Sequence, residues 1–149
     1  MIVVALDGPS GSGKSSTSKA IAIRAGWNYL DTGALYRAMT FLALSIKSEN
    51  PKDIIAAVID KPITFVSDPR DPKVFLDGKD ISKEIRSHEV TEKVSVISAL
   101  AEVRAELLTL QRAIIKKAER GIVVEGRDIG TVVCPDAALK IYLTADISA

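Results

Sequence analysis

The amino-acid sequence predicts an α/β protein with a doubly wound parallel sheet, helices on both faces and a small antiparallel β insertion. Short apolar runs such as 2–6 and 122–125 are typical of buried parallel strands, and they alternate with longer segments of helical periodicity. Over 61–87, β-prone pieces and turn residues replace this alternation, which indicates the insertion. Strands that alternate with helices favour a parallel sheet, because each helix returns the chain to the start of the next strand.

The first three predicted elements are a strand, a glycine-rich loop and a helix. The strand covers 2–6, and residues 14–25 have helical character, with Gly26 placed to end the helix. Between them, residues 8–15 read GPSGSGKS and match the pattern G-x-x-x-x-G-K-[ST]. A strand before the match and a helix after it indicate a phosphate-binding loop (P-loop). The alternative is a glycine- and serine-rich turn that binds nothing.

The residue types of this loop suit a nucleoside triphosphate bound together with Mg²⁺. Glycines let the backbone curl so that several N–H groups point at one phosphate chain, and the positive end of the following helix adds to the attraction. Lys14 is expected to reach the β- and γ-phosphates, and the Ser15 hydroxyl is expected to hold the metal ion. The predicted triphosphate-binding residues are Gly8, Pro9, Ser10, Gly11, Ser12, Gly13, Lys14, Ser15 and Ser16.

A second strand and two helices are predicted before the insertion. Residues 28–30 are apolar enough for the strand, and 34–46 has helical spacing after a turn. Asn50 is a good N-cap and Pro51 a good first helical residue, so a short helix is expected to about residue 59.

The insertion is expected to be a small antiparallel sheet. Residues 63–66 and 73–76 are β-prone, and Asp77-Gly78 is a strong hairpin signal. The predicted domain boundaries are 1–60 together with 88–149 for the P-loop core, and 61–87 for the insertion.

The remainder of the chain is predicted to hold one long helix and two strands. Helical spacing starts at Glu89, and Gly121 is expected to end the helix. The strands are 122–125 and 139–143. One face of the helix is lined by Ile97, Leu100, Val103, Leu107, Leu110, Ile114 and Ala118.

Polar segments follow three of the predicted parallel strands, at 8–15, 31–37 and 126–131. Ligands of such sheets bind beyond the carboxyl ends of the strands, so these segments are expected to meet around one crevice. Arg37 and Arg127 then suggest a second anionic ligand opposite the nucleotide, because the planar guanidinium matches two phosphate oxygens. The alternative is that both arginines are surface residues or pair with nearby aspartates.

Several other polar residues are open to more than one interpretation. Asp128 is a candidate for a hydrogen bond to a substrate amino group, for water-mediated contact with Mg²⁺, or for orienting Arg127. Asp7 and Glu125 are rival acidic groups near strand ends, and the sequence does not rank them for metal contact. His88 is the single histidine and is not expected to be catalytic, because phosphoryl transfer depends on positioning and charge.

The chain resembles the cytidylate kinase family of P-loop nucleoside monophosphate kinases from residue 2 to about residue 146. The phosphate loop alone is generic, whereas DTGALYR at 31–37 and GRDIGTVV within 126–133 are specific to that family. Further matching segments are Leu76-Asp77-Gly78, Val103-Arg104, Gln111-Arg112 and the Glu125 that precedes GRDIGTVV.

The resemblance implies transfer of the γ-phosphoryl group of ATP to CMP or dCMP, with Mg²⁺ bound to ATP. It implies that Ser10, Arg37 and Arg127 contact the CMP phosphate, and that Lys14 and the two arginines neutralise charge on the moving group. Cytosine is expected to be surrounded by Ser95, Arg104 and Asp128. The implied substrate-binding residues are Ser10, Thr32, Tyr36, Arg37, Ser95, Arg104, Arg127 and Asp128.

One departure from the family is length. Family members continue into a lid rich in arginine, a last strand and a final helix, whereas this chain stops at Ala149. Because lid arginines act on the transferring phosphate, the chain as written is expected to be a poor kinase. A complete chain is expected to be a monomer, whereas this chain is expected to associate with other copies through exposed apolar surface. The alternatives are a non-catalytic nucleotide-binding fragment and a P-loop kinase for another small molecule, such as shikimate or gluconate.

The composition of the chain indicates which classes of partner and which cellular location to expect. The chain has 149 residues, 47% hydrophobic and 26% charged, with a net charge of +1, as in ordinary globular proteins. Near-neutral charge gives no reason to expect nucleic-acid or membrane partners. The single cysteine, Cys134, the lack of a signal peptide and the lack of a long apolar run together favour a cytoplasmic location.

Overall fold

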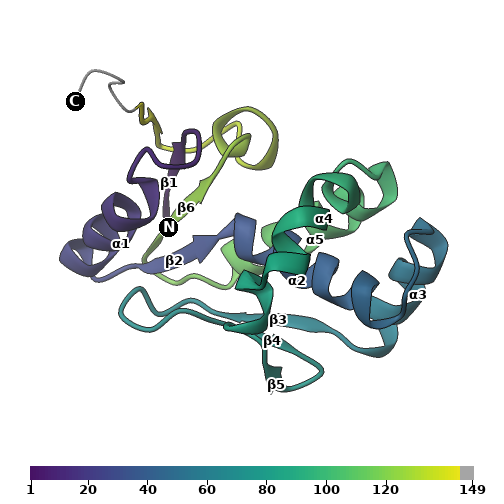
Figure 1. Ribbon diagram of the computed structural model, residues 1–149. Coiled ribbons are helices and arrows are strands. Elements are labelled where there is room, and N and C mark those ends of the chain that lie inside the picture. The colour runs from purple at the N-terminus through teal and green to yellow at the C-terminus, as the bar shows by residue number, and fades with distance from the viewer. Residues whose placement is uncertain (145–149) are drawn as a thin grey trace. The chain divides into compact units, whose positions relative to one another are not determined.

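The computed structural model describes residues 1–144, and the chain forms two compact units (Figure 1). The first, here called the sheet unit, comprises Met1–Thr32, Ser67–Pro72 and the chain from Gln111 onward. The second, the helical unit, comprises Gly33–Val66 and Lys73–Leu110. The domain boundaries predicted from the sequence divide the chain differently and stay a prediction.

The sheet unit is built on four parallel strands in the order β2-β6-β1-β7. The strands are β1 (Ile2–Asp7), β2 (Asn28–Asp31), β6 (Gly121–Gly126) and β7 (Leu139–Tyr142). The apolar runs that predict β1 and β6 supply core side chains of this unit, since none from Val4 to Leu6 or from Ile122 to Val124 is more than 4% exposed. β1 and β6 pair from Ile2 beside Gly121 to Asp7 beside Gly126, so strand ends far apart in sequence meet at one edge.

Helix α1 (Lys14–Ala25) packs on β1, β2 and β6, as Figure 1 shows. It ends at Gly26, as predicted, because Gly26 adopts φ 73°, the left-handed conformation, and the N–H groups of Gly26 and Trp27 cap the last turn. The Trp27 ring then packs directly against Gly121, where a Cβ atom would meet the ring at 2.6 Å. The small residue at the start of β6 therefore lets the indole lie flat on the strand.

The helical unit holds most of the helices and the small sheet. Its helices are α2 (Thr32–Ser45), α3 (Pro51–Asp60), the short 3₁₀ helix η1 (Glu84–Arg86), α4 (His88–Ser98) and α5 (Ala101–Lys116), and the boundary between the units falls within α5. Helix α3 begins where predicted, with the Asn50 side chain accepting from the Lys52 N–H.

The antiparallel sheet has the order β3-β4-β5, with β3 (Ile63–Val66), β4 (Lys73–Leu76) and β5 (Lys79–Asp80). The turn between β4 and β5 has φ 50° at Asp77 and 77° at Gly78, and positive φ at both central residues is what a tight hairpin requires. A parallel sheet flanked by helices, with this small antiparallel sheet, confirms the predicted α/β fold class.

The prediction of one long helix from Glu89 to Gly121 is wrong. The segment forms two helices, α4 and α5, with a break at Ala99-Leu100, and α5 ends at Lys116. Ile97, Val103 and Leu107, on both sides of the break, are at most 1% exposed, so apolar spacing continues through the break and conceals it. Among residues 1–144, no helix combines the length and apolar character needed to cross a membrane.

Candidate functional site

The phosphate loop, between β1 and α1, is shaped by its glycines. Gly11 and Gly13 have φ 77° and 81°, a conformation that L side chains rarely adopt. The Ser12 hydroxyl donates to the Pro9 carbonyl at 2.7 Å and closes the loop. Gly13 is the N-cap of α1 and supplies no side-chain cap, so the first N–H groups of the helix stay available to an anion.

The start of the loop lies tightly against neighbouring strands. The Gly8 N–H donates to the Gly126 carbonyl at 3.2 Å, and the Leu143 N–H donates to the Asp7 carbonyl at 2.8 Å. A Cβ atom on Gly8 would collide with the Leu143 carbonyl oxygen. The ends of β1, β6 and β7 therefore fix where the phosphate loop begins, and glycine is needed there for space.

Lys14, the predicted phosphate-binding lysine, is half-buried and folds back over its own loop. Its Nζ atom lies 3.5 Å from the Pro9 carbonyl oxygen. The carbonyl is a weak partner for an ammonium group, so an incoming phosphate would compete readily for Lys14.

Ser15, the predicted metal ligand, lies against a buried carboxylate. Its hydroxyl donates to Glu125 Oε1 at 2.6 Å, and Glu125 is 2% exposed. Burial, followed by the charge of Asp31, raises the pKa of Glu125, while hydrogen bonds from Ser15 and Tyr29 oppose the shift. Glu125 Oε2 has no hydrogen-bond partner among residues 1–144, so the carboxylate keeps an oxygen available for a cation.

Tyr29, on β2, completes this cluster. Its side chain is 1% exposed, and burial followed by the charges of Asp31 and Glu125 raises the pKa of its hydroxyl far above the usual range. Tyr29 therefore stays neutral and acts as a hydrogen-bond donor to the Glu125 carboxylate. Neither a lone tyrosine in a strand nor its spacing signals this role.

Asp7 is the other acidic candidate for metal contact, and both of its carboxylate oxygens already accept hydrogen bonds. Its Oδ1 accepts from the Ile129 N–H at 2.8 Å and its Oδ2 from the Gly130 N–H at 2.9 Å. Since both oxygens bind backbone N–H groups, the structure distinguishes Asp7 from Glu125, which the sequence leaves unranked.

Arg127 and Asp128 lie between β6 and the π-helical turn η2 (Ile129–Val133). The Arg127 Nη2 atom donates to Ser10 Oγ at 2.8 Å, so two residues predicted to contact the acceptor phosphate meet at the phosphate loop. Asp128 is the N-cap of η2, and its carbonyl accepts from the N–H groups of Val132 and Val133 at 2.9 and 3.2 Å.

Thr32, another predicted substrate residue, is 3% exposed and lies in the sheet unit beside the end of β6. Its hydroxyl donates to the Glu125 carbonyl at 2.8 Å. A Cβ atom on Gly126 would collide with this hydroxyl oxygen, which explains the glycine after Glu125. The Thr32 hydroxyl thus donates its proton to a hydrogen bond within the protein. The contact of Thr32 with substrate stays a prediction.

In the helical unit, Arg37 donates hydrogen bonds to oxygen atoms of η1 and α4. Its Nη1 atom donates to the Ile85 carbonyl at 3.1 Å and to Thr91 Oγ1 at 3.0 Å. Ile85 of η1 and Thr91 in the first turn of α4 therefore orient this guanidinium within the helical unit.

Arg104 and Tyr36, both predicted substrate residues, meet within the helical unit. The Arg104 guanidinium lies 5.7 Å from the centroid of the Tyr36 ring, and its Nη1 atom donates to the Ser98 carbonyl at 3.3 Å. This stacking orients a planar cation beside an aromatic ring. Ser95 is exposed on α4. The predicted substrate contacts of all three residues stay predictions.

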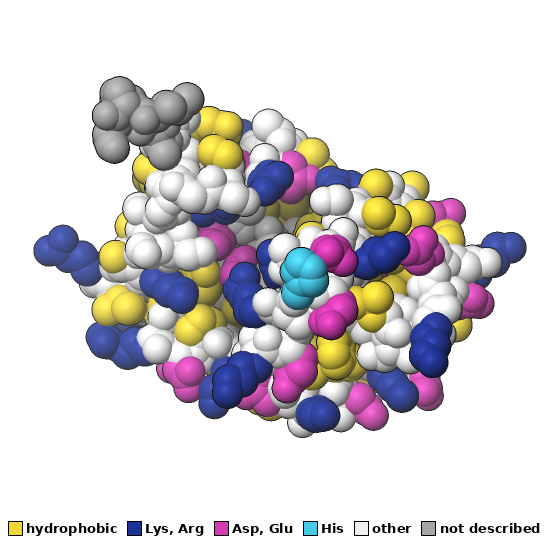
Figure 2. Space-filling model, viewed as in Figure 1, with side chains coloured by type: hydrophobic (Ala, Val, Ile, Leu, Met, Phe, Trp, Pro, Cys, Tyr) yellow, Lys and Arg dark blue, Asp and Glu magenta, His cyan; other side chains and the backbone are white. Residues whose placement is uncertain are grey.

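His88 and Cys134 are not among the predicted site residues. His88 is exposed and pairs with Glu92 across one turn of α4 at 2.7 Å; Figure 2 shows the histidine on the surface beside acidic side chains. Cys134 is half-buried, and burial raises the pKa of its thiol. Within residues 1–144 no cluster of three or more His, Cys, Asp or Glu side chains could hold a metal ion.

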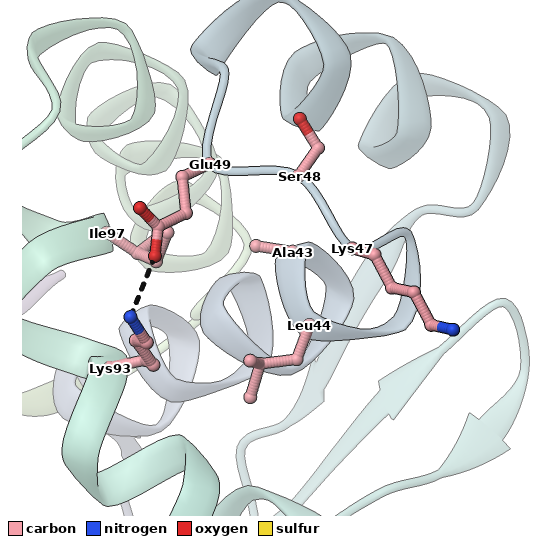
Figure 3. A pocket seen from close by; sticks show the side chains of 7 residues that line it. All are labelled: Ala43, Leu44, Lys47, Ser48, Glu49, Lys93 and Ile97. Carbon is pink, nitrogen blue, oxygen red and sulfur yellow. Dashed lines mark hydrogen bonds and ion pairs between the residues drawn. The ribbon is translucent and has the colours of Figure 1, made fainter.

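A separate pocket of about 390 Å³ opens in the helical unit, where the end of α2 and the segment before α3 face α4 (Figure 3). It contains none of the predicted site residues. Lys93 and Glu49 pair across it at 3.0 Å, as the dashed line in Figure 3 marks. The pair ties α4, which orients Arg37, to the segment after α2.

Comparison with known proteins gives concordant matches. The family model described as Cytidylate kinase matches residues 4–149. The cytidylate kinases of Streptomyces griseus and Streptomyces avermitilis are 54% and 56% identical to this chain, over 97% of the chain and 63% of each relative. That of Nocardia farcinica is 53% identical over 99% of the chain and 64% of the relative. The chain therefore spans just under two thirds of the length of these curated relatives.

Proposed function

The chain belongs to the cytidylate kinase family, and from this premise we propose that the protein transfers the γ-phosphoryl group of ATP to CMP or dCMP, forming ADP and CDP or dCDP. The observation that carries the proposal is the contact of Arg127 Nη2 with Ser10 Oγ at 2.8 Å. It brings a guanidinium, which suits a phosphate group, to the loop that suits the triphosphate. Transfer between two phosphates requires this juxtaposition of donor and acceptor.

ATP is proposed to bind with its phosphates in the loop of residues 8–16. The uncapped N-terminus of α1 and the positive φ of Gly11 and Gly13 supply backbone N–H groups for the phosphate oxygens. Lys14 would leave the Pro9 carbonyl for the β- and γ-phosphates. In the transition state, Lys14 neutralises charge that spreads over the moving group.

The residues around Ser15 fit Mg²⁺ bound with ATP. Oxygen ligands suit this ion, and Glu125 offers a buried carboxylate with Oε2 unpartnered among residues 1–144 beside the Ser15 hydroxyl. Ser15 is proposed to hold the ion, and Glu125 is the acidic residue proposed to face it. Asp7 is the poorer choice, because both of its oxygens bind N–H groups. When bound, the ion supplies charge neutralisation at the phosphate oxygens.

The acceptor nucleotide is proposed to bind through its phosphate and its base. Arg37, Arg127 and Ser10 would contact the phosphate, with the arginines also acting on the transferred group. Ser95, Arg104 and Asp128 would surround cytosine. The contact of Arg104 with the Tyr36 ring supports this role, because it orients the Arg104 guanidinium before a base binds. Tyr36 and Thr32 complete the proposed set. The attacking atom is already a phosphate oxygen, so alignment and charge carry the reaction without a general base.

Location and assembly follow the proposed reaction. ATP and nucleoside monophosphates are cytoplasmic metabolites, so the protein is proposed to act in the cytoplasm, with these small molecules as its partners and without nucleic acid or membrane. A monomer is the proposed state of the complete protein, since both nucleotides are proposed to contact residues of one chain.

Calorimetric titration with CMP and UMP, alongside a phosphoryl-transfer assay with ATP and Mg²⁺, tests the proposal. We expect saturable CMP binding and roughly tenfold or more weaker UMP binding, because uracil cannot donate the hydrogen bond of the cytosine amino group. Failure of a protein that melts cooperatively by circular dichroism to bind CMP, or equal affinity for the two nucleotides, would contradict it.

A further inference from the structure

The loop that follows β6 is anchored at both ends by charged side chains, one from β1 and one from α5. We propose that Arg112, at the second anchor, is a positioning residue: it fixes the turn that follows Arg127 and Asp128 and thereby sets the affinity of the site for the acceptor phosphate. This inference rests on the proposed function, and it assigns a residue that touches neither nucleotide.

The first anchor is Asp7, at the end of β1. It is 9% exposed, and its carboxylate accepts from the successive N–H groups of Ile129 and Gly130 at 2.8 and 2.9 Å. Hydrogen bonds to an ionised acceptor are the stronger kind, and two of them fix the first residues of η2 in orientation as well as place. The next residue in the chain is Gly8, so the same strand end carries this anchor and the phosphate loop.

The second anchor is Arg112, on the last turns of α5. Its Nη2 atom donates to the Val132 carbonyl at 3.1 Å and its Nε atom to the Val133 carbonyl at 3.4 Å. These are the last carbonyls of η2, and carbonyls at the end of a helical turn have no partner within the turn. The guanidinium fork of Arg112 supplies both donors from one rigid plane.

The turn between the anchors needs this support. The Val132 N–H donates to the Asp128 carbonyl with α-helical spacing, whereas the bonds from Val133 to Asp128 and from Cys134 to Ile129 have the wider, five-residue spacing of a π-helical turn. Such turns are rare by themselves and occur where the surroundings hold them, often at functional sites. Arg127 and Asp128 immediately precede the turn, so a shift of the turn would move the Arg127 guanidinium away from Ser10.

Arg112→Ala tests the inference, because Arg112 is exposed and its removal leaves the core intact. Lys116→Ala is the matched control, since it removes a cation from an exposed position one turn further along α5. The first measurement is hydrogen exchange of the free chain. We expect about tenfold faster exchange at the amides of Val132, Val133 and Cys134 in Arg112→Ala and no change in Lys116→Ala.

The second measurement is CMP affinity in a double-mutant cycle with Arg127→Ala. We expect Arg112→Ala to weaken CMP binding roughly tenfold in the wild-type background and to have little effect when Arg127 is already absent. Affinity for ATP should change less than twofold. A merely structural role of Arg112 would instead lower affinity for CMP equally in both backgrounds and lower ATP affinity as well, and that result would overturn the inference.

The two measurements separate this inference from the proposed function. If the folded wild-type chain binds no CMP, the proposed function fails, and the acceptor part of the inference fails with it. The exchange experiment still decides whether Arg112 fixes the turn. Unchanged hydrogen exchange at residues 132–134 in Arg112→Ala would contradict the claim that Arg112 fixes the turn, whatever the nucleotide affinities.

Discussion

The candidate residues of the sheet unit and those of the helical unit are held in place by different kinds of contact. In the sheet unit, strand ends, glycine turns and backbone N–H groups fix the phosphate loop and the loop of Arg127. In the helical unit, Arg37 and Arg104 are oriented by bonds to carbonyls and a hydroxyl and by stacking on a ring. Backbone anchors tolerate little movement, whereas long side chains on helices can reorient at small cost.

This difference suggests that the two units have different roles in the proposed reaction. The proposed triphosphate would need many N–H groups aimed at fixed points, which a rigid loop supplies. The proposed acceptor would enter and leave in every cycle, and side chains that can adjust suit such a ligand. We therefore expect substitutions in the sheet unit to affect catalysis more strongly than those in the helical unit.

The largest effect is expected for Lys14→Ala. Loss of the cation that follows the moving phosphoryl group should lower the transfer rate about 10³-fold, on the scale known for charge-stabilising side chains in phosphoryl transfer. The measurement is kcat in a coupled assay, with Lys116→Ala as control. A loss of less than tenfold would show that Lys14 does not stabilise the transfer step, and it would contradict the expectation that the sheet unit is the more sensitive of the two units.

Glu125→Gln should weaken the apparent affinity for Mg²⁺ in ATP-dependent transfer by roughly 10–100-fold, the range found for groups that support a metal site. Without metal the same change should stabilise the fold. Burial raises the pKa of Glu125, so ionisation costs the folded state stability as pH rises through that pKa.

Thermal melts in a chelator check this second effect. Glutamine does not ionise, so Glu125→Gln should melt higher than the wild type at neutral pH. The advantage should shrink to nothing as pH falls below the ordinary glutamate pKa of about 4. A lower melting temperature at neutral pH would show that the hydrogen bonds from Ser15 and Tyr29 outweigh the burial of the charge.

Arg37→Lys should raise KM for CMP roughly tenfold with a smaller change in kcat, because lysine cannot reproduce the planar fork. Thr91→Val, which removes the hydroxyl oxygen that accepts from Arg37, should raise KM for CMP only a fewfold. Arg24→Lys on the exposed end of α1 is the control. If Thr91→Val equals Arg37→Lys, the helical unit depends on fixed orientation as strictly as the sheet unit does.

The smallest effect is expected for Lys93→Ala, which removes the ion pair with Glu49 across the pocket of the helical unit. Both partners are exposed, and such pairs contribute about 0–1 kcal/mol to the free energy of unfolding. Urea denaturation with Lys52→Ala as control measures it. A change above this range would indicate that the pair holds α4, and with it Arg37, more firmly than the exposure suggests.

Local signals in the sequence account for most elements and for the phosphate loop. The apolar run before Gly8, the glycine pattern, the cap at Asn50 and the Asp77-Gly78 turn are short-range features, so propensity and sterics are sufficient to predict them. The break between α4 and α5 is different: helical spacing continues across it, and no glycine or proline marks it.

The amino-acid sequence by itself determined the glycine-rich loop between a strand and a helix, the strands of the parallel sheet, and the residue types that suit a nucleotide kinase. Only the tertiary structure decided which carboxylate near Ser15 has an unpartnered oxygen among residues 1–144 and which one binds backbone N–H groups. It also decided that Tyr29 contacts Glu125 and that Arg112 donates to the carbonyls of Val132 and Val133. Asp7 and Ile129 are distant in sequence, as are Ser15 and Glu125, and they meet because β1 and β6 pair in one register. Such contacts depend on long-range packing, which no local pattern of residues encodes.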